Sequence, residues 1–93
     1  MSGHDDIFEP LLGKRRTTRQ ALLEVAERWA QAPIHDAAVR ASLEDAVRHK
    51  ILRGQIGGEI PADADAAELS RGFVAGLVAG RGTAAVSRVF PPL

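Results

Sequence analysis

The stretch 66–80 constrains the fold of this chain most, because as a helix it is apolar or small around nearly its whole circumference. One face carries large apolar side chains: Phe73, Val74, Leu77 and Val78. The opposite face is small: Gly72, Ala75, Gly76, Ala79, Gly80 and Thr83. Such a helix must be covered on all sides, and two further short helices can shield only one of them. We therefore expect a partner helix on the other side.

Gly72, Gly76 and Gly80 recur every four residues, a spacing that lets two helix backbones approach closely. A glycine in a helix interior costs about 1 kcal/mol relative to alanine, so packing must offset roughly 3 kcal/mol. Two interpretations are open. A glycine pair receives the first helix of the same subunit, or the face receives a helix from a second copy, which the apolar circumference favours.

Capping residues predict three helices. Thr17 with Gln20 fits a capping box for the first helix, which Pro33 ends. Asp36 begins the second, which runs to Gly57-Gly58. Asp65 begins the third, which runs to about Gly80 or on to Val89. No segment shows the pattern of paired strands, so the predicted class is all-α.

We expect residues 1–13 to form an N-terminal tail and residues 14–93 a single helical domain. The last two of its three helices are predicted to form an antiparallel pair, and two such pairs build a four-helix bundle in a homodimer. The predicted dimer interface lies on both helices: Val39, Leu43, Val47, Leu52, Gly72, Phe73, Gly76, Leu77 and Gly80.

Composition excludes several function classes. The 93 residues contain no cysteine, which removes disulfides, thiolate zinc sites and thiol nucleophiles. Twelve Lys and Arg balance twelve Asp and Glu, an unusual charge for a dedicated binder of nucleic-acid backbone. The most apolar window falls short of the roughly 20 residues that a membrane-spanning helix needs. With no targeting segment visible, we expect a cytoplasmic protein without membrane contact.

No catalytic, metal or cofactor constellation is apparent, so we do not expect an enzyme. His4, His35 and His49 have no ligand-type partner at helical spacing. Ser42, Ser70 and Ser87 stand in helical stretches without a nearby base. One basic cluster, Lys14, Arg15, Arg16 and Arg19, either touches phosphates or forms a solvated helix start; acidic residues just upstream favour the second interpretation.

The run 36–65 resembles the C-terminal region of TetR-type transcriptional regulators. A long helix ends in Gly54-Gln55-Ile56-Gly57-Gly58-Glu59, an acidic cap Asp63-Ala64-Asp65 follows, and a glycine-bearing apolar helix comes next. The resemblance covers roughly residues 17–90. It implies a homodimer built from the last two helices and a pocket for a small hydrophobic effector. Leu22, Val25 and Trp29 would line what remains of that pocket, or simply pack in the core.

The chain departs from the family at its N-terminal side. Residues 18–29 superficially resemble the first helix of a helix-turn-helix domain, but no second helix and no recognition segment follow. The resemblance therefore implies a regulatory half that dimerises and does not bind operator DNA specifically by itself. The alternative function is a stand-alone helical module for protein–protein interaction, whose small face receives an unrelated partner.

Overall fold

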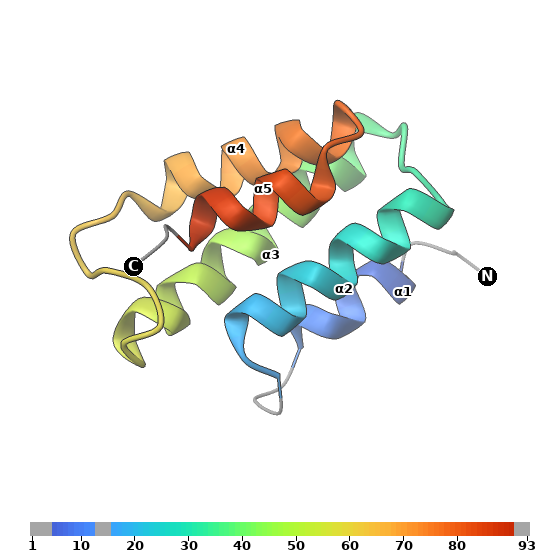
Figure 1. The fold of residues 1–93 in the computed structure, drawn as a ribbon. Coiled ribbons are helices and arrows are strands. Elements are labelled where there is room, and N and C mark those ends of the chain that lie inside the picture. The colour runs from blue at the N-terminus through green and yellow to red at the C-terminus, as the bar shows by residue number, and fades with distance from the viewer. Residues whose placement is uncertain (1–4, 13–15, 91–93) are drawn as a thin grey trace.

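The computed structural model describes residues 5–12 and 16–90, and in these residues the chain is helical without strands. The elements are α1 (Asp5–Phe8), the 3-10 helix η1 (Glu9–Leu11), α2 (Thr18–Gln31), α3 (Ala37–Ile56), α4 (Ala66–Val78) and α5 (Gly82–Val89). Figure 1 shows α5 in front of α4 and α3, with α2 and α1 beside them. The predicted all-α class is confirmed.

The three predicted helix starts are confirmed. Thr17 Oγ1 accepts from the Gln20 amide at 3.1 Å, and the Gln20 side chain accepts from the Thr17 amide at 3.1 Å, which completes the capping box. Asp36 caps α3 through the amides of Ala38 and Val39. Asp65 caps α4 in the same way. Each cap satisfies amides that have no partner within their own helix.

One predicted boundary differs from the structure, and one of two alternatives is decided by it. Residues 5–11, expected in a tail, form α1 and η1, and Ile7 and Leu11 are buried against α2. The third helix ends near Gly80, the first of the two expected ends, and does not run on to Val89: α4 ends at Val78, Gly80 adopts a φ of 77°, and α5 begins at Gly82. A left-handed residue stops a helix, so the turn at Gly80 lets α5 fold back onto α4.

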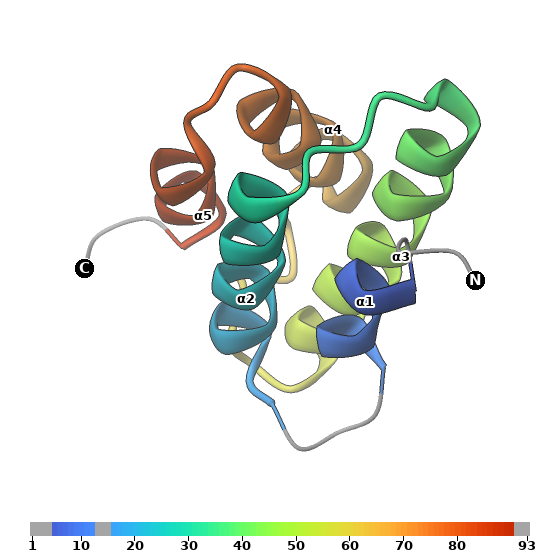
Figure 2. The same cartoon turned by 90° about the vertical axis from the view of Figure 1, so that its right-hand side faces the viewer.

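The core is closed by contacts within the single chain. α4 packs against α3 on one side and α5 on the other, and α5 also packs on α2 (Figure 2). Fully buried large side chains come from four helices and the α3–α4 turn: Leu22, Val25, Leu43, Val47, Ile51, Ile60, Phe73, Leu77 and Val89. The antiparallel pairing of the last two predicted helices and the homodimer bundle stay predictions.

Small residues bring the helices close together. A Cβ added at Gly76 would lie 2.5 Å from the Cβ of Ala85, and one added at Gly82 would lie 3.0 Å from the Cβ of Ala26. The close approach that the glycine spacing predicts at Gly76 is therefore used by α5 of the same chain. Of the two interpretations drawn from the sequence, neither the first helix nor a second copy fills this position.

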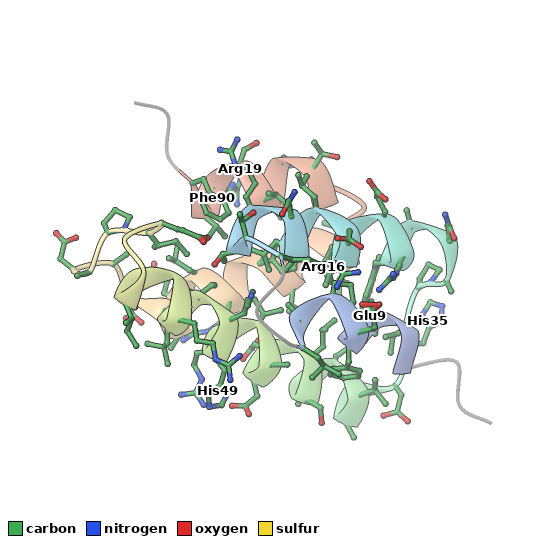
Figure 3. The ribbon with its side chains drawn as sticks, turned by 90° about the horizontal axis from the view of Figure 1, so that it is seen from below. Glu9, Arg16, Arg19, His35, His49 and Phe90 are labelled. Carbon is green, nitrogen blue, oxygen red and sulfur yellow. The ribbon has the colours of Figure 1, made fainter. Side chains whose placement is uncertain are left out.

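Charged side chains fasten the N-terminal elements to α2. Arg16 Nε donates to Glu24 Oε2 at 2.6 Å, and Arg16 Nη1 lies 3.2 Å from Glu9 Oε2. Figure 3 shows Arg16 and Glu9 side by side beneath α2. The carboxylates of Glu24 and Glu9 raise the pKa of Arg16. Arg16, one residue of the predicted basic cluster, is thus paired with acidic neighbours of the same chain. This pairing favours the interpretation of the cluster as a solvated helix start over a phosphate contact.

Candidate interaction surface

α4 presents an outward face that is unusually poor in charge for an exposed helix surface. It includes seven exposed residues, of which only Glu68 and Arg71 are charged; the others are Ala67, Gly72, Ala75, Val78 and Ala79. We refer to these seven residues as the α4 face. Exposed helix surfaces of soluble domains are normally polar, so this face is the first candidate for a contact.

A groove runs between α4 and α5 beside the α4 face. One part encloses about 180 Å³ and is lined by Gly72, Ala75, Gly76, Ala79, Arg81, Ala84, Ala85 and Arg88. The next part encloses about 380 Å³ and is lined by Asp65, Glu68, Leu69, Gly72, Phe73, Arg88 and Val89. Gly72 and Arg88 line both parts, so the two are adjacent, and we refer to them together as the α4–α5 groove.

The groove has ends of opposite charge. Arg81, which precedes α5, lies at the end where α4 terminates, and Glu68 lies in the first turn of α4 at the other end. Within residues 5–12 and 16–90, neither side chain forms an ion pair or hydrogen bond. Asp65, beside Glu68, is occupied as the N-cap of α4. Glu68 and Arg81 are therefore available to a second molecule.

The predicted interface residues divide between core and surface. Leu43 and Val47 are 0% exposed and Phe73 and Leu77 are 1% exposed, so these four contact their own chain and present no surface to another. The reason is that α3 packs against α4, α2 and η1, and α4 packs against α3, α5 and α2, all within the same chain. Val39 and Gly76 are half-buried, whereas Leu52, Gly72 and Gly80 are exposed.

The residues expected to line an effector pocket form closed core instead. Leu22 and Val25 are 0% exposed and Trp29 is 5% exposed, and the cavities along α4 are lined by other residues. This agrees with the core-packing interpretation of these three positions. The groove residues Arg81, Ala84 and Arg88 were not expected at any site. The sequence Gly80-Arg81-Gly82 is the signal for the left-handed turn that places them beside α4, but an end near Gly80 does not by itself predict a further helix packed on α4.

A second groove lies between α3 and α4. It encloses about 320 Å³ and is polar, lined by Ala41, Glu44, Asp45, Arg48, Ala67, Ser70 and Arg71. Asp45 forms an ion pair with Arg48, and the hydrogen bond that Arg48 donates lowers the pKa of Asp45, with a smaller contribution from the nearby His49. Asp45 and Arg48 are therefore paired with each other, whereas the side chains of Glu44 and Arg71 of this groove have no ion pair or hydrogen bond within the described residues. The α4–α5 groove differs from this one in its floor of small residues.

The histidines do not come together. Figure 3 shows His35 and His49 at separate places, and His49 Nδ1 lies 2.8 Å from the Asp45 carbonyl oxygen. The described part of the chain contains no group of three or more side chains suited to hold a metal ion. Its helices also lack one that is long and apolar enough to cross a membrane.

Comparisons of the chain with protein-family models, with curated proteins and with solved structures gave no match. The resemblance to TetR-type regulators consequently rests on the run 36–65 and on the helix that follows it. An argument about function has to begin from the α4 face and the α4–α5 groove.

Proposed function

We propose that this chain is the self-association domain of a TetR-type transcriptional regulator, and that it acts as a homodimer. The observation that carries the proposal is the α4 face, a surface of small and apolar residues. Beside it lies a groove in which the side chains of Glu68, Arg81 and Arg88 form no ion pair or hydrogen bond with the described residues. Two-fold assemblies suit such regulators because their operators repeat a half-site in inverted orientation.

Gly72 supports a contact outside the chain. Glycine in a helix interior costs about 1 kcal/mol relative to alanine. At Gly76 the cost is offset within the chain, because only glycine admits the Cβ of Ala85. A Cβ added at Gly72 would meet no atom within 4 Å. The absence of a side chain at Gly72 therefore has no reason within the fold, and a second molecule that approaches the backbone there provides one.

Of the other features that the resemblance implies, the proposal leaves out the effector pocket and keeps dimerisation. The small hydrophobic effector loses its expected pocket, since Leu22, Val25 and Trp29 are packed in the core. Dimerisation keeps its support through the α4 face. The proposal assigns DNA reading to another domain and places the chain in the cytoplasm, where such regulators meet their operators.

Analytical ultracentrifugation of the chain over a concentration series tests the proposal. Each copy has a mass of 9.9 kDa, and we expect sedimentation as a dimer of twice that mass at micromolar concentration. A folded species that stays at the monomer mass up to the solubility limit contradicts self-association. That result would favour the alternative, a stand-alone helical module whose groove receives an unrelated helix.

A fusion tests whether self-association serves DNA binding. The chain is joined to a helix-turn-helix domain that binds its palindromic operator only when paired. We expect the fusion to bind the operator at lower concentration than the isolated DNA-binding domain, because pairing brings two half-site readers together. The chain alone should give no operator shift at low salt. Equal binding by the fusion and the isolated domain would contradict the proposed role.

A further inference from the structure

The α4–α5 groove has a shape and a charge pattern that fit α4 itself. Its floor is made of small residues, among them Gly72, Ala75 and Ala79, and its ends carry Arg81 and Glu68. We infer that α4 of a second copy fills this groove in antiparallel orientation, with the two-fold axis at Ala75 and with Glu68 of each copy paired with Arg81 of the other. The inference rests on the proposed self-association and specifies its interface.

The position of Ala75 follows from helix geometry. Successive residues of an α-helix are turned by about 100°, which places Ala75 near the middle of the exposed arc of α4. Glu68, Gly72 and Ala79 lie on the side of this arc that faces α5. Two helices approach most closely where their facing residues are small, so a two-fold axis beside Ala75 gives the shortest distance between backbones.

The register then follows from the symmetry. In an antiparallel pair centred on Ala75, each residue faces the one equally far from Ala75 on the other copy. Gly72 faces the neighbourhood of Ala79 of the second copy, so that small residues meet. Glu68 is seven residues before Ala75, about 10.5 Å along the axis. Arg81 follows the turn that ends α4 and lines the groove at that end. Each carboxylate therefore comes to lie beside the guanidinium of the other copy.

Charge identifies a second copy as the occupant. The occupant must bring a negative group to Arg81 and must tolerate Glu68 at the other end of the groove. An antiparallel α4 does both, since Glu68 of the second copy reaches Arg81. Arg88, which lines both parts of the groove, comes to lie near the C-terminal end of the second α4, where unpaired carbonyls favour a cation.

Charge reversal is the first test. Glu68→Arg and Arg81→Glu are made singly and together, and dimer dissociation is measured by sedimentation. By symmetry each single change turns two attractive pairs into two repulsive ones, and we expect the dissociation constant to rise about tenfold or more. The double variant restores both pairs with reversed sign, and its constant should return to within about threefold of the parent.

Matched controls separate this contact from a general effect of charge. Glu27→Arg on α2 and Arg53→Glu on α3 change exposed residues away from the groove, and neither should shift dissociation. Circular dichroism verifies that all variants fold. If the parent dimerises and single and double variants do so equally well, the inference is overturned while the proposed function stands. If the parent itself is monomeric, both fail.

A disulfide gives an independent test, because the chain has no cysteine of its own. Ala75→Cys places one thiol beside the two-fold axis, within the short Cα–Cα separation that a disulfide requires. Under mild oxidation we expect Ala75→Cys to crosslink fully between copies, and Ala30→Cys, on exposed α2 surface, to crosslink poorly. A dimer that crosslinks no faster through residue 75 than through residue 30 overturns the inference.

Discussion

Gly76 of α4 and Ala85 of α5 touch at a point where neither can be larger. A Cβ built on Gly76 would lie 2.5 Å from the Cβ of Ala85 and 3.6 Å from its Cα. The atoms in the way belong to a short side chain and to backbone, so only a shift of α5 could relieve the overlap. The glycine thus determines how closely α5 is seated on α4, and through it the shape of the groove.

Gly76→Ala should destabilise the fold. Overpacking against Ala85 costs about 1–3 kcal/mol, and the higher helix propensity of alanine offsets about 1 kcal/mol of this, for a net loss of up to about 2 kcal/mol. Urea unfolding followed by circular dichroism measures the change. Gly72→Ala is the matched control on the same helix: its added methyl group meets nothing within 4 Å, and it should stabilise the monomer by about 0.5–1 kcal/mol. Equal effects at the two positions would contradict the seating of α5.

Glu59 joins the α3–α4 turn to the start of α2. Its Oε2 accepts a hydrogen bond from the Thr18 amide at 2.7 Å, an amide of the first helical turn that has no partner within α2. Glu59→Ala should therefore reduce the free energy of unfolding by about 1–2 kcal/mol. Glu59→Gln, which retains an acceptor oxygen, should lose less. Asp63→Ala, on the exposed part of the same turn, should change stability by less than about 0.5 kcal/mol.

The lowered pKa of Asp45 makes the protein less stable as the pH falls. The hydrogen bond from Arg48 lowers the pKa of Asp45 in the folded state below the unfolded value of 3.8. The stabilisation is therefore complete above the unfolded pKa and is lost as pH falls through the folded one. Urea midpoints of the parent and of Asp45→Asn should differ at neutral pH and converge below pH 3.8. A difference that persists unchanged in acid would show that the variant acts through something other than this charge.

Local signals predicted the three long helices well, whereas their mutual arrangement was harder to predict. The caps at Thr17, Asp36 and Asp65 act through neighbouring amides, so the sequence around each contains the whole interaction. The burial of Phe73 and Leu77 depends on which helices pack against α4. A local sequence pattern does not predict that packing. The small face was recognised, but α5 of the same chain packs against one of its residues, Gly76.

The turn at Gly80 limits which surface residues can be predicted from the sequence. The sequence leaves open whether the third helix ends near Gly80 or runs on to Val89. Neither alternative predicts a separate helix that packs on α4, so large apolar residues such as Phe73 become interface candidates. With the left-handed turn in place, α5 lies beside α4, and Arg81 and Arg88 enter a groove that sequence spacing does not reveal. The structure therefore removes Phe73 and Leu77 from the predicted surface and retains exposed small residues such as Gly72.

Ala75→Arg and Leu52→Glu distinguish the two exposed surfaces on which a dimer could form. Leu52 is 40% exposed on the outer side of α3, and Ala75 lies on the α4 face. An arginine at position 75 puts two long cations beside the symmetry axis, and sedimentation should show the dimer lost at micromolar concentration. Leu52→Glu should leave the dissociation constant within about threefold of the parent, since a charge on an uncovered surface costs little. A dimer lost through Leu52→Glu and retained in Ala75→Arg would place the interface on α3, because a charge disrupts association only where the second copy removes water from it.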